Sequence, residues 1–306
     1  MAGFGITKGS FTMLLRALIL GSVVMAGGTP LRAEAPVLTP AEAQAEVKAP
    51  AVPAEVAALA EAMRIGEVMS IMREEGVEYG GTLEEEMFPG RGGSEWRAVV
   101  GLIYDTATMR SRFDAVFARE MAADPEATAA ATEFFTSDLG ARIIELEIEA
   151  RRALLEDAVE EAARVMAEDM LAGGEPRMDA LQAFAETNDL IESNVSGALN
   201  ANLAFYKGLA EGGALEDDIP EDQMLSDVWS QEPEVRADTE DWLYSYLALA
   251  YQPLSDDDLA AYHAFSETPA GQKLNAALFA AFDEMFTQMS FDLGRAAARQ
   301  MQGEDI

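Results

Sequence analysis

Histidine and cysteine, which often carry out acid–base or metal chemistry, are scarce in this chain. His263 is the only histidine among 306 residues, and there is no cysteine. An imidazole acts as a general base or a metal ligand only with suitable partners beside it. Without cysteine or a second histidine, a transition-metal site has too few nitrogen and sulfur ligands. We therefore expect His263 to have a packing or surface role.

Carboxylates occur in three short runs, at residues 84–86, 216–218 and 256–258. Consecutive side chains point around a helix and rarely converge on one ion, and none of the runs has the spacing of an EF-hand loop. The third run follows Ser255, which fits the amino end of a helix. A weak calcium site at one of these runs is the alternative.

No signature of an enzyme family accompanies these carboxylates. The sequence lacks the Gly-x-Ser-x-Gly and Ser-x-x-Lys patterns of serine hydrolases and related enzymes. A glycosidase-like pair of carboxylates has no sequence signature when 55 residues are acidic. The sequence therefore predicts no catalytic, cofactor-binding or metal-ligating residue, and no cofactor.

Methionines recur at helical spacing in two segments. Met63, Met69 and Met72 fall in one, and Met285 and Met289 in the other. Thioethers can bind copper(I), and flexible methionine side chains can line a groove for a partner helix or an unfolded chain. Their commonest use is to fill irregular gaps in a core. We favour the core role and keep the groove and the copper site as alternatives.

The clearest motif is a joint between two helices, and it occurs twice. The candidate joint residues are Phe134, Ser137, Gly140 and Arg142 in the first copy and Phe265, Thr268, Pro269, Gly271 and Lys273 in the second. The hydroxyl residue is expected to cap the following helix, and proline is tolerated at its first position. The glycine makes room for the preceding aromatic helix, and the basic residue can reach a nearby carboxylate or carbonyl. The motif predicts a packing joint and no catalytic site.

The second copy resembles an exported bacterial family called domain of unknown function 2059 (DUF2059) over residues 254–300. The family pattern is an acidic helix start, an aromatic pair, a variable residue, Ser, Pro, a variable residue, Gly and a basic residue. This chain departs from it at Ser266, where the family has Tyr, at Thr268 in place of Ser, and at Asp138 of the first copy in place of Pro. The resemblance implies an all-helical envelope protein and no known reaction.

Helix formers dominate the chain between these joints, and long β-branched runs are absent. The expected helices of the first half are 54–75, a short one ending at Phe88, 95–121, one ending at Phe135, and a long fifth helix over 138–170. The second half repeats the plan. The sequence predicts an all-α fold of two tandem modules, 54–174 and 175–303, of about five helices each.

The amino-terminal segment is typical of export. Residues 1–33 have a basic start, an apolar stretch at 17–26 and small residues for cleavage after Ala33, as in a signal peptide. An uncleaved anchor is the alternative, although the apolar stretch is short for a membrane span. Residues 34–53 are rich in Pro and Ala and are expected to form a tether. The predicted location is the periplasm, with secretion as the alternative.

The net charge of −34 at pH 7 limits the classes of partner. It repels nucleic acids and anionic membranes and attracts cationic proteins or peptides. No segment after the signal looks like a transmembrane helix. The favoured hypothesis is a non-enzymatic protein- or peptide-binding module, chaperone-like or a scaffold, that binds a cationic envelope protein or peptide. An acidic-residue hydrolase of envelope glycan and a structural spacer of the envelope are the alternatives.

Overall fold

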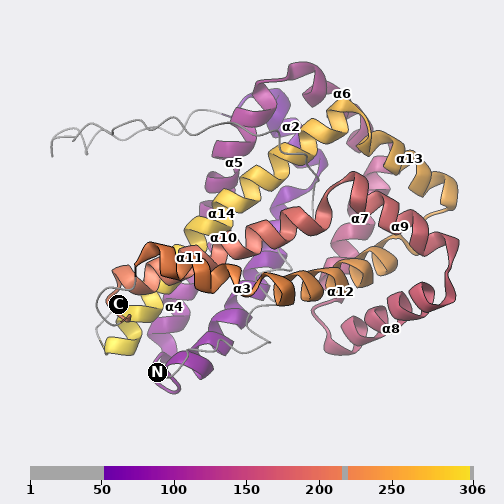
Figure 1. Cartoon of the computed structure of the whole chain (residues 1–306). Coiled ribbons are helices and arrows are strands. Elements are labelled where there is room, and N and C mark those ends of the chain that lie inside the picture. Colours follow the sequence, from indigo (N-terminus) through magenta and orange to yellow (C-terminus); the bar gives the residue numbers. More distant parts are fainter. Residues whose placement is uncertain (1–51, 216–219, 304–306) are drawn as a thin grey trace.

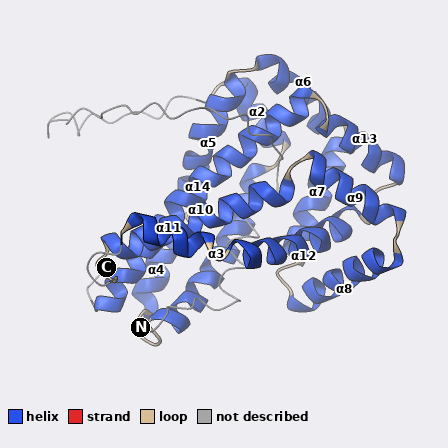
Figure 2. Ribbon diagram, in the orientation of Figure 1, coloured by secondary structure: helices blue, strands red, loops and turns tan. Residues whose placement is uncertain are grey.

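The computed structural model describes residues 52–215 and 220–303. The expected signal peptide, 1–33, lies outside these residues, as does nearly all of the expected tether, 34–53. The described residues form α-helices joined by turns, without a strand, which confirms the predicted all-α fold (Figure 2). None of the described helices combines the length and apolar character needed to cross a membrane.

The described helices run in chain order from α2 to α14 (Figure 1). The first half contains α2 (Ala54–Ala62), α3 (Ile65–Met87), α4 (Gly93–Ile103), α5 (Thr106–Ala122), α6 (Pro125–Thr136), α7 (Asp138–Ala153) and α8 (Asp157–Gly173). The second half contains α9 (Pro176–Thr187), α10 (Leu190–Glu211), α11 (Glu221–Trp229), α12 (Glu232–Tyr251), α13 (Asp256–Ser266) and α14 (Pro269–Gln302). By order and length, α14 is the counterpart of α7 and α8 together.

The first expected helix, 54–75, is broken at Arg64. This residue has a left-handed φ of 53°, and it separates α2 from α3. Asp189, with a φ of 48°, separates α9 from α10 in the same way. Left-handed backbone is rare outside glycine, so its occurrence at corresponding turns supports the internal repeat. The separate short helix expected before Phe88 is wrong, because α3 runs through that segment.

Two longer expected helices are also broken. In place of the single helix over 95–121, Asp105 starts a new helix, because its side chain accepts a hydrogen bond of 2.9 Å from the Thr108 N–H. The expected helix over 138–170 divides after Leu154, and α8 then leaves α7 to pack on α9 and α12. Apolar residues continue at helical spacing through both breaks, so periodicity alone predicted single helices. Each half therefore holds more helices than expected.

The two halves exchange their carboxyl-terminal helices. Helix α14 of the second half packs against α4, α5 and α6 of the first half, besides its own α10. Helices α7 and α8 of the first half pack against α12 of the second half. Since α5 and α12 are counterparts, each half covers the same helix of the other. One continuous apolar core accordingly crosses the expected boundary between residues 174 and 175.

Candidate functional site

The two predicted joints meet each other in the structure. We call the turn between α6 and α7, and the turn between α13 and α14, the elbows. The rings of Phe134 and Phe265, which occupy the same place in the two motifs, stack with centroids 4.0 Å apart and planes 9° apart. Direct contact between counterpart residues is typical of a local two-fold axis. The elbows thus mark the place where the two halves face each other.

The hydrogen bonds of the two elbows are the same. Ser137 Oγ accepts from the Gly140 N–H at 3.1 Å and donates to the Phe134 carbonyl at 2.6 Å. Thr268 Oγ1 accepts from the Gly271 N–H at 3.0 Å and donates to the Phe265 carbonyl at 2.7 Å. Each hydroxyl therefore caps one helix and closes the end of the preceding one.

The remaining joint residues also have structural surroundings. A Cβ added at Gly140 would lie 2.1 Å from the Phe134 carbonyl oxygen, and one at Gly271 would lie 2.3 Å from that of Phe265. Pro269 occupies the first turn of α14. Lys273 Nζ lies 3.1 Å from Glu120 Oε2, which joins α14 to α5. Arg142 is exposed at the surface.

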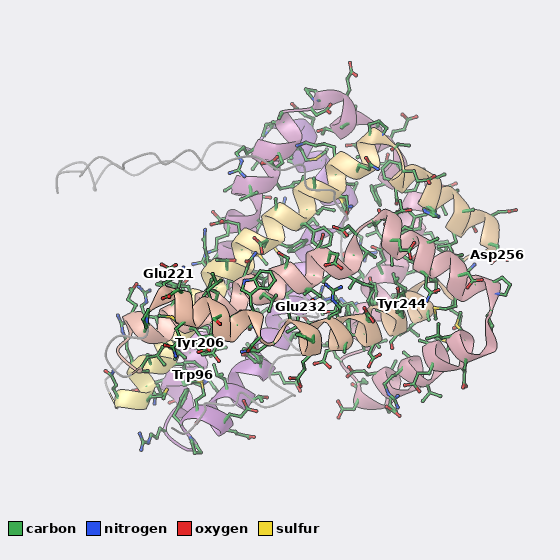
Figure 3. The ribbon with its side chains drawn as sticks, in the orientation of Figure 1. Trp96, Tyr206, Glu221, Glu232, Tyr244 and Asp256 are labelled. Atoms are coloured by element: carbon green, nitrogen blue, oxygen red, sulfur yellow. The ribbon has the colours of Figure 1, made fainter. Side chains whose placement is uncertain are left out.

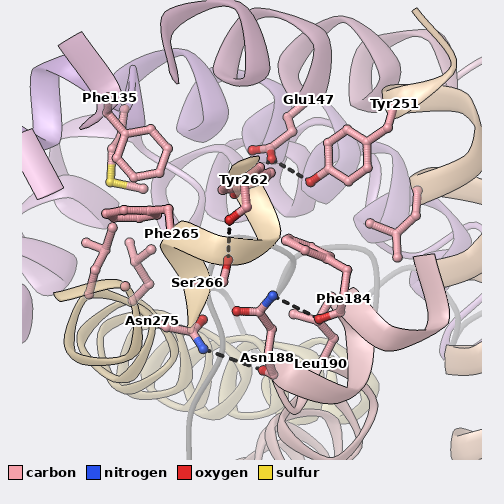
Figure 4. A pocket seen from close by; sticks show the side chains of 15 residues that line it. Phe135, Glu147, Phe184, Asn188, Leu190, Tyr251, Tyr262, Phe265, Ser266 and Asn275 are labelled. Atoms are coloured by element: carbon pink, nitrogen blue, oxygen red, sulfur yellow. Dashed lines mark hydrogen bonds between the residues drawn. The ribbon is translucent and has the colours of Figure 1, made fainter. Parts of the chain in front are cut away.

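A small cavity lies behind the second elbow, and we call it the elbow cavity (Figure 4). Its volume is about 40 Å³, enough for a few water molecules but too small for a sugar or a peptide. Aromatic and aliphatic side chains form most of its wall, and four polar side chains, Ser266 among them, interrupt these. The aromatic lining residues are Phe135, Phe184, Tyr251, Tyr262 and Phe265, and the polar ones discussed below are Glu147, Asn188 and Asn275.

Glu147 is a buried carboxyl group in the wall of this cavity. Its side chain comes from α7, and the residue is only 5% exposed. Its Oε1 accepts hydrogen bonds from the hydroxyls of Tyr251, at 2.8 Å, and Tyr262, at 3.3 Å (Figure 4). Its Oε2 is buried without a hydrogen-bond partner. Burial raises the pKa of Glu147 to about 7, against the opposing effect of the two tyrosines.

Two asparagines add a second unpartnered acceptor. Asn275 Nδ2 donates to the Asn188 carbonyl at 3.5 Å, and Asn188 Nδ2 donates to the Phe184 carbonyl at 2.9 Å (Figure 4). Both amide donors are thus directed at the backbone. The Asn275 Oδ1, however, is buried and has no partner. The cavity therefore offers hydrogen-bond acceptors to an occupant.

A second buried carboxylate lies near by but is neutralised. Glu75 of α3 accepts two hydrogen bonds from Arg151, at 3.1 and 2.7 Å, and both residues are buried. Arg151 lies one turn beyond Glu147 on α7, and its charge is already balanced by Glu75. Of the described residues that line the elbow cavity, Glu147 is the only carboxylate. A glycosidase needs two carboxyl groups facing the same substrate, so this cavity does not fit that reaction.

A larger groove runs between α10 and α14, and we call it the α10/α14 groove. It has a volume of about 470 Å³, and its polar edge carries Asp189, Glu192 and Asp283. Ala276, Phe279 and Ala280 supply its apolar wall, and none of the described lining residues is basic.

The carboxylates of this groove are only partly neutralised. Glu192 is paired with Arg236 at 2.6 Å. Asp283 accepts a hydrogen bond of 3.0 Å from Asn200 Nδ2, a neutral donor. Burial raises the pKa of Asp189 and of Asp283, and the neighbouring carboxylates Glu192 and Glu284 add to the two shifts. A cation in the groove would relieve both effects.

A third concavity lies between α8, α9 and α12, with a volume of about 570 Å³. Met166, Met170 and Leu181 line it, and Arg177 lies among its polar residues. The guanidinium of Arg177 bonds to Asp256 at 2.6 Å and to two backbone carbonyls, so it ties α9 to the start of α13.

Comparisons with known proteins give no relative. A scan against models of protein families, a search of curated proteins and a search of solved structures found no match. The resemblance to DUF2059 therefore stays a prediction.

The other residues considered in the sequence have structural surroundings. His263 Nε2 lies 2.7 Å from Thr187 Oγ1, which joins α13 to α9. The run at 256–258 begins α13 with a capping box, and Asp256 projects from that end into solvent (Figure 3). Among the described residues, no group of three or more acidic or histidine side chains could hold a metal ion. The run at 216–218 lies outside the described residues.

The first carboxylate run and the methionines also have packing roles. Glu84 accepts hydrogen bonds from the N–H groups of Gly92 and Gly93. The five methionines singled out in the sequence are all buried in the core, as the favoured interpretation predicted: Met63, Met69, Met72, Met285 and Met289.

Sequence reasoning missed the polar residues of the elbow cavity, although the repeat carries a signal for them. Counted from the elbow glycines, Glu147 corresponds to Leu278 and Asn275 to Ile144. Counted from the left-handed residues that follow α2 and α9, Asn188 corresponds to Met63. Each position is polar in one copy and apolar in the other. Three such departures converge on one cavity.

Proposed function

We propose that this protein binds a basic segment of another protein or a cationic peptide in the α10/α14 groove. The observation that carries the proposal is the groove itself, with three carboxylates beside an apolar wall and no basic side chain among its described lining. Lysine and arginine side chains combine a cationic head with an apolar stem, so such a lining suits them. The net charge of −34 adds long-range attraction for the same partners.

The size and openness of the groove support the same class of ligand. A volume of about 470 Å³ accommodates several side chains of a peptide. Asp189 and Asp283 stay partly uncompensated in the free protein, so a cation that reaches them gains charge-assisted hydrogen bonds. The periplasm, reached through the signal-like residues 1–33, is the compartment that we propose for this activity.

The two alternative functions fit less well. A spacer of the envelope predicts no apolar concavity, and the described residues form two grooves and a cavity. A hydrolase needs one protonated and one ionised carboxyl group, so their environments should move the two pKa values apart. In the α10/α14 groove, burial moves the pKa values of Asp189 and Asp283 in the same direction.

The test compares binding of a lysine-rich amphipathic peptide with that of its glutamate-rich analogue by fluorescence anisotropy. We expect only the lysine-rich peptide to bind, with an affinity that falls as salt is added. The double variant Asp189→Asn and Asp283→Asn removes two carboxylates and keeps their shape. Since an exposed ion pair contributes up to about 1 kcal/mol, we expect about tenfold weaker binding.

The matched control removes two carboxylates from another face of the molecule. Glu145→Gln and Glu149→Gln change the net charge equally on the exposed side of α7 and should leave most of the affinity. Equal losses in both double variants would show that net charge attracts the peptide without a site. No binding of the lysine-rich peptide would refute the proposal.

A further inference from the structure

When Glu147 is ionised, the elbow cavity holds a negative charge that no described residue around it balances. Glu147 lines it, the nearest guanidinium on the same helix belongs to Arg151, and Arg151 is bound to Glu75 at 2.7 Å. The tyrosine hydroxyls that contact the carboxylate are neutral donors to Oε1 only. A buried, ionised carboxylate without a cation is costly, so either a proton or a cationic ligand is required.

The acceptors and rings of the cavity define the chemistry of that ligand. Glu147 Oε2 and Asn275 Oδ1 both lack a partner, so each can accept a hydrogen bond from an occupant that reaches it. The amide nitrogens of Asn188 and Asn275 each donate one hydrogen bond to a backbone carbonyl. Five aromatic residues also line the wall, and ring faces attract cations. A water molecule can donate hydrogen bonds to these acceptors, but it does not balance the charge of an ionised Glu147.

We propose that the elbow cavity binds a small protonated amine, an ammonium ion or the head of a short primary alkylamine, with Glu147 as its counter-ion. The cavity volume of about 40 Å³ fits a group of this size and excludes a quaternary ammonium with four methyl groups. The ligand would donate to Glu147 Oε2, and Asn275 Oδ1 is a further buried acceptor in the wall of the cavity. Neither the α10/α14 groove nor its peptide takes part, so this site stands independently of the proposed function.

The polar departures from the internal repeat support a ligand over a chance cavity. Where the second half has Asn188 and Asn275, the first half has Met63 and Ile144, both fully buried. The opposite departure, Glu147 against Leu278, comes from the first half. An apolar core at all these positions is thus compatible with the elbow. The three polar side chains lower the stability of the fold unless a ligand that pairs with them occupies the cavity.

The site should respond to pH through Glu147 alone. The titratable groups facing it are Tyr246 and Tyr251 of α12, Tyr262 of α13 and Arg151 of its own helix. Burial and the nearby carboxylate keep the pKa of each tyrosine well above 10, so these groups stay neutral. The pKa of Glu147 lies at about 7, so amine binding should be strong at pH 8 and weak at pH 5.

The experiment measures the melting temperature of the full chain at pH 8 in ammonium, methylammonium, tetramethylammonium and sodium chloride at equal ionic strength. We expect ammonium or methylammonium to raise the Tm by about 3 °C when present at about tenfold its Kd. Isothermal titration calorimetry then gives the affinity directly. Tetramethylammonium and sodium should give no rise, and the effect should disappear at pH 5.

Three variants locate the ligand. Glu147→Gln keeps the shape and should weaken amine binding at least about tenfold. Asn275→Ile introduces the residue of the other copy and should weaken it as well. Glu149→Gln, an exposed carboxylate on the same helix, should leave binding unchanged. The proposal is overturned if all four salts give equal Tm values, if sodium acts as methylammonium does, or if Glu147→Gln binds the amine normally.

Discussion

At the scale of single residues, Glu147 is the group whose chemistry differs most from its state in an unfolded chain. The ordinary pKa of its carboxyl is 4.5, and burial raises it to about 7. The folded protein therefore holds this proton more tightly than the unfolded chain does. Stability from this group is fully present below pH 4.5, falls as the pH rises to 7, and is lost above it.

Replacing Glu147 by Gln should therefore stabilise the protein in a pH-dependent way. At pH 8 the variant avoids a buried charge, and a shift of this size corresponds to roughly 3 kcal/mol in the free energy of unfolding. At pH 4.5 the two proteins should differ little, because the native carboxyl is then protonated. Urea unfolding of both proteins at the two pH values measures the difference. A gain of the same size at both would contradict the buried-charge account.

At the scale of elements, the elbows depend on glycines that admit no side chain. A Cβ at Gly140 or Gly271 would overlap the backbone of the preceding helix. Gly140→Ala and Gly271→Ala should each lower the free energy of unfolding by about 2 kcal/mol or more. Gly81 is the control, because it lies inside α3 with nothing within 4 Å of an added Cβ.

The free energy of unfolding of the control variant should change in the opposite direction. Alanine at Gly81 should raise stability by about 0.5–1 kcal/mol, since glycine is the poorer helix former. Chemical denaturation of the three variants gives the comparison. Elbow variants as stable as the native protein would show that the elbow can move apart at little cost.

The elements also show what the sequence could and could not predict. The caps and glycines of both elbows are local, so residues spaced three apart were enough to predict them. The apolar spacing runs through the breaks near Arg64, Asp105 and Leu154, and it hid the local cap that Asp105 forms with Thr108. The periodicity therefore predicted the helical class and misplaced the ends.

The elbow cavity was missed for a related reason. Glu147 lies between Glu145 and Glu149, which are exposed on α7, and the sequence analysis did not single it out. Its burial comes from α12 and α13, whose tyrosines lie far away in sequence. Only a position-by-position comparison of the two copies would have marked it.

At the scale of the whole molecule, the exchange of helices determines how the chain unfolds. Helix α14 completes the core around α5, and α7 with α8 completes the core around α12. Neither half can therefore keep its apolar face covered when the other half is lost. The stacked rings of Phe134 and Phe265 add a further contact between the halves.

The chain should therefore unfold in one cooperative transition, although its sequence reads as two modules. Gly140→Ala acts in the first half and Gly271→Ala in the second. If the halves were independent, each variant would lower the transition temperature of its own half only. We expect both variants to lower the temperature of one and the same transition in calorimetry, with equal calorimetric and van't Hoff enthalpies. Two resolved transitions, each moved by one variant alone, would show that the exchanged helices do not couple the halves, and the interlocked core would then fail as the account of stability.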